Sequence, residues 1–347
     1  MRLRSLLYSL PVVASALLPM SSTVAAFAAD ATGPYSIVDH WKIGGEGGWD
    51  YLVTDSAKHT LYLTHGTRVE VVDTDTGKVV GAIQELKGTH GVALDADGKK
   101  GYISEGAGNA VVVFDRQTYE KVNSIPVGTN PDAILFEPVT KTIWAFNGKS
   151  NDASVIDGDT QKVVATIKLS GRPEFSVSDG KGTIFVNIET KNSIVRLDAK
   201  SKAVTAEWPL PGCESPSGLA MDVAGQQLFS VCDGKVMTVT DASSGKQLAK
   251  VAIGDGSDAA AFEEKNQLAF SSNGDGTLSV VDAKAHKVIQ TLATQKGART
   301  MALDAGRDRV YLVTAEFGPK PAATAANPRP RATPVPGSFT VIAVGRK

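Results

Sequence analysis

The sequence predicts an all-β fold, a seven-bladed β-propeller with four-stranded antiparallel blades, on three observations. An apolar run that ends in an acidic residue, followed by a polar turn and a second apolar run, occurs seven times at intervals of 40 to 43 residues. Each interval holds four short runs rich in Val, Ile, Thr and Ala, as expected of strands rather than helices. The last interval lacks its fourth run, and an isolated run of that kind precedes the first interval.

The seven repeats keep a regular register. The acidic residues that end the first run lie 40, 42, 42, 43, 41 and 41 residues apart. A fixed period of this length indicates a repeat architecture, and four-stranded units repeated radially form propellers of about four to eight blades. The seven acidic residues are Asp55, Asp95, Glu137, Asp179, Asp222, Glu263 and Asp304.

The second repeat illustrates the four strands of a blade, which we name a to d from the channel outward. Strand a is "GVALD" (91–95), strand b is "KGYIS" (100–104), strand c is "AVVVFD" (110–115) and strand d is "KVNSIPV" (121–127). The a-to-b and c-to-d turns are short and rich in the Asp and Gly that tight turns need, so we interpret them as scaffold. The d-to-a links and b-to-c loops share the opposite face and vary more, which favours that face for function.

The predicted ring closes through its two ends. Strand b of the seventh repeat ("VYLVT", 310–314) is followed by a long loop and then by "SFTVIAVGRK" (338–347), which supplies strand c. The segment "YSIVDHWKIGGEGG" (35–48) resembles a strand d with its exit loop. We therefore expect this N-terminal strand to complete blade 7, which covers sheet edges that would otherwise invite aggregation.

Two stretches carry a family resemblance. The segments "TIWAFNGKSNDASVIDGDTQKVVATIKLSGRP" (142–173) and "TIFVNIETKNSIVRLDAKSKAV" (183–204) resemble the YVTN-type propeller repeat, although "YLVT", "FVNI" and "YLTH" replace the literal tetrapeptide. The resemblance covers nearly all of the chain after its first 28 residues, and exported proteins of the YncE-like group share this size and leader. It implies the propeller fold and export, and it implies no particular ligand, because one fold hosts many functions.

Residues 1–28 are predicted to be a signal peptide. Arg2 and Arg4 precede an apolar stretch from Leu6 to Leu18, and the segment ends with Ala-Phe-Ala at 26–28. The alternative is a membrane anchor, but the stretch is short for a bilayer span and Pro11 interrupts it. We expect a periplasmic or secreted protein without membrane insertion, in which residues 29–347 form one propeller domain.

Charge and motifs exclude several function classes. Without the leader the chain carries 34 basic and 37 acidic residues, a net charge of −3, and no basic run interleaves with aromatic residues, so nucleic acid is not an expected partner. The sequence has no C-x-x-C or C-x-x-C-H motif, and "GGEGGWD" (44–50) lies in a d-to-a link rather than at the start of a helix. We therefore expect no cofactor.

One position of the repeat predicts a ligand site. Five residues before each of the seven acidic residues, where strand a begins, every blade has a polar residue. These side chains are expected to form a polar ring at the mouth of the central channel, where ligands commonly bind. The alternatives are a solvated rim and a simple salt bridge between Asp50 and Arg299. The ring residues are Asp50, His90, Asp132, Glu174, Ser217, Asp258 and Arg299.

The ring offers two kinds of chemistry besides binding. Serine hydrolysis would need Ser217 within reach of His90, but the two are three blades apart and Ser217 is not in a G-x-S-x-G turn. His90, Asp132 and Glu174 lie on consecutive blades and together supply the imidazole and carboxylate ligands of a divalent metal. A single histidine is a thin basis for a metal site, so the metal stays an alternative.

Two further features lie on the same face. Cys213, in the link that enters blade 5, and Cys232, at the end of strand b of that blade, are expected to form a disulfide; two unpaired thiols are the alternative. Residues 316–337 form a Pro/Ala-rich insertion between strands b and c of blade 7. Such a loop serves as a lid, as a partner tether or as a passive insertion.

These observations favour a monomeric binding or interaction module for a small polar ligand or a protein segment at the channel mouth. The alternative is an enzyme on the same scaffold, a lactonase-like hydrolase or lyase that uses His90 with neighbouring acids and a divalent metal. The sequence leaves the choice between binding and catalysis open.

Overall fold

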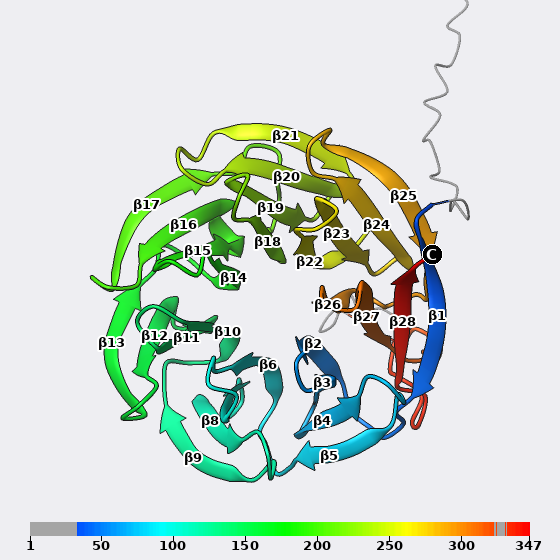
Figure 1. Ribbon diagram of the computed structural model, residues 1–347, viewed down its shortest axis with the longest axis horizontal. Coiled ribbons are helices and arrows are strands. Elements are labelled where there is room, and N and C mark those ends of the chain that lie inside the picture. The colour runs from blue at the N-terminus through cyan, green and yellow to red at the C-terminus, as the bar shows by residue number, and fades with distance from the viewer. Residues whose placement is uncertain (1–32, 323, 325–329, 331) are drawn as a thin grey trace, which may run out of the picture.

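The predicted seven-bladed propeller is confirmed. The computed structural model describes residues 33–322, 324, 330 and 332–347, so the signal peptide predicted over residues 1–28 lies outside the described residues. Within the described ranges, 28 strands form seven four-stranded antiparallel sheets around a central axis (Figure 1). The one helical segment in this part of the chain is a 3-10 turn, η1 (Glu189–Lys191). No described helix has the length and apolar character that a bilayer span requires.

Each blade uses four strands in chain order from the channel outward, except that the outermost strand of blade 7 is the N-terminal strand. The innermost strands are β2 (Trp49–Asp55), β6 (Thr89–Leu94), β10 (Pro131–Glu137), β14 (Pro173–Ser178), β18 (Leu219–Asp222), β22 (Ser257–Glu263) and β26 (Thr300–Asp304). The second strands are β3 (Thr60–His65), β7 (Lys100–Glu105), β11 (Thr142–Asn147), β15 (Thr183–Ile188), β19 (Gln227–Cys232), β23 (Leu268–Asn273) and β27 (Arg309–Thr314). The third strands are β4 (Arg68–Asp73), β8 (Ala110–Asp115), β12 (Asp152–Asp157), β16 (Ser193–Asp198), β20 (Val236–Asp241), β24 (Thr277–Asp282) and β28 (Thr340–Arg346). The outermost strands are β5 (Val79–Ile83), β9 (Lys121–Pro126), β13 (Lys162–Lys168), β17 (Ala203–Pro209), β21 (Gln247–Ala252), β25 (Lys287–Ala293) and β1 (Tyr35–Lys42).

The core lies between neighbouring blades. The second strands are covered on both faces. In β11, whose sequence is "TIWAFN", every residue is therefore buried. The outermost strands face solvent, and in β13 ("KVVATIK") only one residue is fully buried. Trp144 and Phe146 of β11 pack in one cluster with Ile184 and Val186 of β15 in the next blade. Burial of apolar side chains between blades therefore holds the ring together.

The predicted closure of the ring by the N-terminal strand is confirmed. β1 pairs antiparallel with β28, from Tyr35 opposite Arg346 to Lys42 opposite Thr340. Figure 1 shows β1 on the outside of blade 7, beside β28. The two ends of the propeller are thus held in one sheet, and β28 has no free edge.

Two aromatic side chains anchor β1. The buried Tyr35 hydroxyl donates a hydrogen bond of 2.9 Å to Glu263 Oε2, and the Tyr35 backbone N–H donates one of 2.9 Å to Gln290 Oε1, both in blade 6. Trp41 packs against Tyr311 of β27 with ring centroids 5.2 Å apart. The closing strand therefore contacts blade 6 as well as its own blade.

The short-turn face is built from aspartates that accept backbone hydrogen bonds. In six blades the Asp that ends the third strand accepts the backbone N–H of the residue three positions later. Such Asx turns fix tight c-to-d connections, as the sequence indicated. These aspartates are Asp73, Asp115, Asp157, Asp198, Asp241 and Asp282.

A pair of ionic contacts on this face joins blades 1 and 2. The guanidinium of Arg116, which is 5% exposed, contacts the Asp55 carboxylate and donates a hydrogen bond of 3.1 Å to Asp95 Oδ1. Removing one partner of a buried charge leaves the other uncompensated. Asp55 and Asp95 therefore serve stability on the face opposite the ring residues.

Deleting residues 29–45 should destabilise the whole propeller, because β28 would lose its partner and the contacts of Tyr35 and Trp41 would vanish. We expect aggregation, or a melting temperature lower by roughly 10 °C or more, measured by circular dichroism. His40→Ala, at an exposed position of β1, is the matched control and should stay within about 0.5 kcal/mol of the parent. An unchanged melting temperature in the truncation would refute the closure argument.

Candidate functional site

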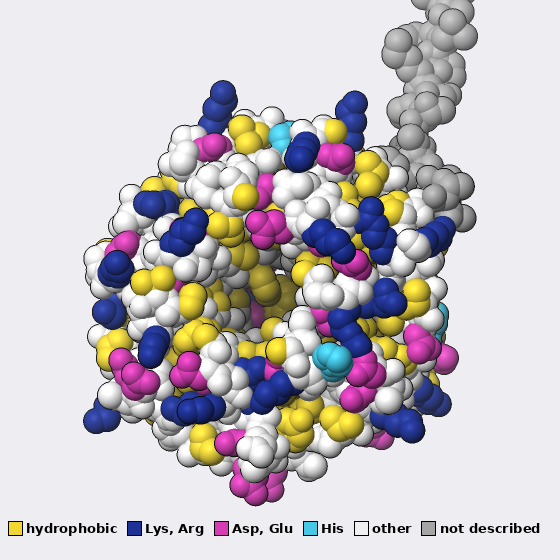
Figure 2. All heavy atoms as spheres, in the orientation of Figure 1, with side chains coloured by type: hydrophobic (Ala, Val, Ile, Leu, Met, Phe, Trp, Pro, Cys, Tyr) yellow, Lys and Arg dark blue, Asp and Glu magenta, His cyan; other side chains and the backbone are white. Residues whose placement is uncertain are grey.

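The ring residues stand where the innermost strands begin. Five are the second residues of their strands, Arg299 directly precedes β26, and Ser217 lies two residues before the start of β18. Because the seven strands surround one channel, these positions are brought together from across 250 residues of sequence. Figure 2 shows that the molecule is hollowed at the centre of the seven blades.

Asp50, His90 and Asp132 form the tightest cluster of the ring. Asp50 Oδ2 lies 2.7 Å from His90 Nδ1, and Asp132 Oδ1 lies 3.6 Å from the same nitrogen. One ligand atom from each residue lies within 4.8 Å of the others. Burial lowers the pKa of His90, but the hydrogen bond that His90 donates to Asp50 and the charges of Asp132, Asp50 and Glu174 outweigh burial, so the pKa is raised.

The carboxyl groups of the ring crowd one another. Burial raises the pKa of Asp50 to about 6, with further increases from the charges of Asp132 and Asp258 and a lowering by His90. Burial and the charge of Asp132 raise the pKa of Glu174 to about 8. Like charges in a poorly solvated space disfavour ionisation. The ring therefore gathers several carboxyl groups, and in Asp50 and Glu174 the charged form is disfavoured.

Glu174 is directed toward a neighbouring arginine. Arg172 Nη2 lies 2.8 Å from Glu174 Oε1, and Arg172 Nη1 lies 3.0 Å from Glu189 Oε2. Arg172 lowers the pKa of Glu174, but its side chain is 44% exposed, and burial together with Asp132 prevails. This pairing also corrects the predicted metal set of His90, Asp132 and Glu174: among the described residues, the group that converges is Asp50, His90 and Asp132.

The remaining ring residues have their own partners. Arg299 Nε pairs with Asp258 Oδ2 at 3.2 Å, and Asp50 is hydrogen-bonded to His90, so the considered Asp50–Arg299 salt bridge is not the arrangement found. The Ser217 hydroxyl donates to the backbone carbonyl of Ser257 at 3.2 Å. It links blades 5 and 6 and is not positioned as a nucleophile for His90.

Two aromatic residues next to the ring positions were not among the site residues predicted from the sequence. Tyr51 of blade 1 and Phe175 of blade 4 meet across the channel with ring centroids 4.7 Å apart. The Tyr51 hydroxyl donates to the Asp258 carbonyl at 3.3 Å, and burial raises the pKa of Tyr51 well above its ordinary value. The two rings therefore form a neutral floor under the carboxylates.

The repeat does contain a signal for this floor. Tyr51 and Phe175 each follow a ring residue, and in the other five blades the residue at that position is small. Two large side chains among five small ones indicate that these two fill the space in the channel. The five small residues are Gly91, Ala133, Gly218, Ala259 and Thr300.

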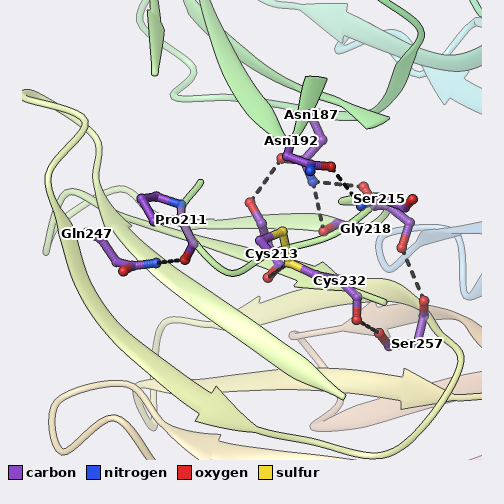
Figure 3. The surroundings of a disulfide bond; sticks show 11 residues. Asn187, Asn192, Pro211, Cys213, Ser215, Gly218, Cys232, Gln247 and Ser257 are labelled. Carbon is purple, nitrogen blue, oxygen red and sulfur yellow. Dashed lines mark hydrogen bonds between the residues drawn. A yellow bond between two sulfur atoms is a disulfide. The ribbon is translucent and has the colours of Figure 1, made fainter. Parts of the chain in front are cut away.

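A disulfide braces the link into blade 5 (Figure 3). Cys213 and Cys232 are both buried and are joined, with Cα atoms 5.3 Å apart. The Asn187 side-chain amide donates hydrogen bonds of 2.9 Å to the Ser217 carbonyl and 3.2 Å to that of Gly218. These contacts hold the backbone at Ser217, the ring residue of blade 5.

A second hollow, of about 1130 Å³, lies beside the ring and is lined in part by described residues from the two ends of the 316–337 insertion, among them Phe317 and Pro334. Phe317 at the base of the loop contacts Trp49 with ring centroids 6.0 Å apart. Among the described ring residues, Arg299 alone lines this hollow, so the hollow borders the carboxylate cluster without containing it. Lys296 and Lys320 give it the opposite charge.

The fold and the ring define the class: a seven-bladed β-propeller with polar residues gathered at one end of its channel. No protein-family model matches the chain. It is 25% identical over 209 residues to the uncharacterized protein YncE of Salmonella typhi and 27% identical over 210 residues to that of Salmonella typhimurium strain LT2. The chain spans 58% of the length of these curated relatives, and each match covers 58% of the chain.

The chain is thus similar in sequence to these two proteins, and its seven four-stranded blades are those of a propeller. Among solved structures, a chain of Kuenenia stuttgartiensis hydrazine synthase superposes with a TM-score of 0.69 at 18% identity. That match covers 77% of this chain and 92% of the other. At this level of identity the likeness concerns the fold alone.

Protein purified without reductant and unfolded in denaturant should expose no titratable thiol. The double variant Cys213→Ser/Cys232→Ser should lose about 2–4 kcal/mol of unfolding free energy, because the bridge constrains the 19-residue separation in the unfolded chain. Denaturant titration by tryptophan fluorescence gives the free energy. Two reactive thiols in the parent protein would contradict the pairing.

Raising the pH from 5 to 9 in the presence of EDTA should destabilise the protein in part through Glu174. The folded state keeps a proton on this carboxyl between about pH 4.5 and 8 that the unfolded state has lost, so stability falls as pH rises through that window. Each unit by which a carboxyl pKa is raised costs the charged form about 1.4 kcal/mol. Glu174→Gln should therefore be more stable than the parent at pH 9, by roughly 1–3 kcal/mol, and flatten the profile. A profile identical to that of the parent would rule out the raised pKa.

Proposed function

We propose that this chain is an exported binding module that holds a small, positively charged polar ligand, or a basic side chain of a protein segment, at the ring. The carrying observation is the crowding of the carboxyl groups of Asp50, Asp132 and Glu174 in a partly buried space. Burial and mutual repulsion raise the pKa of Asp50 to about 6 and that of Glu174 to about 8. A cation at the ring would relieve that repulsion, and attraction between charges is stronger in a poorly solvated site than in bulk water.

The shape of the site favours a small cationic group. Tyr51 and Phe175 close the channel beneath the carboxylates, so a ligand enters from the ring face and meets an aromatic floor. A cation over an aromatic face gains attraction in addition to its ion pairs. Such a floor suits the amine or guanidinium of a ligand better than an anion.

Three observations support export to the periplasm or beyond the cell. The N-terminal segment has the composition of a leader, the chain resembles exported proteins of the YncE-like group, and Cys213 and Cys232 are joined. Structural disulfides persist in oxidising compartments and are rare in the cytosol.

A lactonase-like hydrolase or lyase is the second candidate. The hydrogen bond between Asp50 and His90 favours it, because a carboxylate that orients an imidazole is a common arrangement for general base catalysis. Ser217 is engaged with the Ser257 carbonyl, so the attacking group would have to be water. Steady hydrolysis of a test lactone that His90→Ala abolishes would favour the enzyme over the module.

The test uses the tripeptide Gly-Arg-Gly and spermidine as cationic probes in isothermal titration calorimetry. We expect binding by the parent protein, and a loss of at least about tenfold in affinity for His90→Ala, Asp132→Ala and Glu174→Ala, since a lost charged contact is worth about 1.5–3 kcal/mol. These three variants should fold, because each relieves crowding or alters a partly solvated group.

Asp55→Ala, Asp95→Ala and Asp179→Ala form the control set on the turn face. The first two release Arg116 and should lower stability by about 1–4 kcal/mol, while all three should bind both probes as the parent does. Loss of binding in the turn variants with retention in the ring variants would mean that the opposite face carries the function.

A further inference from the structure

We propose that Asp50, His90 and Asp132 form a binding site for a divalent transition-metal ion. The inference rests on the proposed function, since the ion would be the cation, or part of the cation, that the ring holds. The three residues come from consecutive blades and offer one imidazole nitrogen and two carboxylate groups that face a common space.

The spacing of the donor atoms suits an ion of this kind. Zinc binds nitrogen and oxygen ligands at about 2.0–2.2 Å, which places neighbouring ligand atoms about 3.4 Å apart in a tetrahedral site. His90 Nδ1 lies 3.6 Å from Asp132 Oδ1 and 2.7 Å from Asp50 Oδ2. A movement of under about 1 Å by the Asp50 carboxylate would bring its distance from His90 Nδ1 to ligand spacing.

The carboxylate of Asp132 is the independent observation that points to a ligand. Its side chain is 9% exposed, and no described residue donates a hydrogen bond to it. Its nearest polar partner in the described chain is His90 Nδ1 at 3.6 Å, beyond hydrogen-bond distance. Buried carboxylates are normally hydrogen-bonded or bound to a cation, and this group has only the long ion pair with His90, so a metal ion would supply the close contact that it lacks.

The backbones that carry the ligands are fixed by hydroxyl groups of the second strands. Ser104 donates a hydrogen bond of 2.5 Å to the Asp132 carbonyl and accepts one of 2.9 Å from the N–H of Gly91, next to His90. Thr64 accepts a hydrogen bond of 3.1 Å from the Asp50 N–H. Sites held on rigid strands keep their geometry better than sites on loops.

The orientation of His90 leaves one nitrogen for the ion. A Cβ atom at Gly106 would lie 2.5 Å from His90 Nε2, so that edge of the ring packs against a residue without a side chain. The other nitrogen, Nδ1, faces the two aspartates. An ion would replace the Nδ1 proton that now bonds to Asp50, and binding would release that proton.

The donor set selects among metals. One imidazole with two carboxylates suits zinc or manganese, whereas calcium takes six to eight oxygen ligands and magnesium keeps most of its waters. Three protein ligands leave positions for water or for a bound polar molecule. Glu174 stands close enough to act on the pKa of His90, and its pairing with Arg172 keeps it outside the ligand set.

The test titrates tag-free mature protein, stripped with EDTA, with zinc chloride by calorimetry and with manganese chloride by electron paramagnetic resonance. We expect one ion per chain with a dissociation constant in the micromolar range or below, and release of protons that changes the measured heat between buffers of different ionisation enthalpy. His90→Gln and Asp132→Asn should each weaken binding at least tenfold. Asp179→Asn, which changes a carboxylate on the opposite, turn face, should stay within threefold of the parent.

The outcomes separate this inference from the function on which it rests. Absence of metal binding up to 1 mM, or undiminished binding in both His90→Gln and Asp132→Asn, overturns the metal site. If Gly-Arg-Gly then still binds to the parent, the cationic binding module stands without the metal. If neither probe binds, both proposals fail. Circular dichroism of each variant shows whether it is folded, and the two ligand variants change different strands, so a folding defect in one leaves the other decisive.

Discussion

Pairing of the N-terminal strand β1 with β28 is the constraint on which the rest of the molecule depends. The blades gain their apolar contacts from their neighbours, so an open ring would expose the flanks of the first and last blades. Closure also fixes the radius at which the innermost strands stand. Seven strand starts, separated by some 40 residues each, therefore meet around one space, and the side chains at those starts act on one another.

The same closed ring gives carboxylates opposite properties at its two ends. On the turn face, Asp241 accepts hydrogen bonds from Ser243 and Ser244, and these lower its pKa to about 2. At the other end, burial and neighbouring carboxylates raise the pKa of Glu174 to about 8. The turn aspartates satisfy the backbone and are at low energy when charged. In the ring, the charged forms of Asp50 and Glu174 are disfavoured, and a bound cation would stabilise them.

Much of this could be predicted from the sequence, because a period of about 41 residues determines both the number of blades and which positions share a level along the channel. The seven polar positions and the closing strand follow from that period. Pairing within the ring does not follow, because it depends on side-chain rotamers and on distances across the channel. Thus Arg299 pairs with Asp258 rather than Asp50, and the contact of Tyr51 with Phe175 joins blades that are far apart in sequence.

The central claim is that the ring disfavours the charged form of its carboxyl groups unless a cation is bound, and the most direct measurement is the ionisation of Glu174 itself. Carbon-13 NMR of protein labelled at glutamate carboxyls, stripped of metal and assigned with Glu174→Gln, follows this group between pH 3 and 10. A midpoint near 8 is the expected result. A midpoint near the ordinary glutamate value of about 4.3 would contradict the account, because it would mean that Arg172 and solvent already offset the charge of the ring.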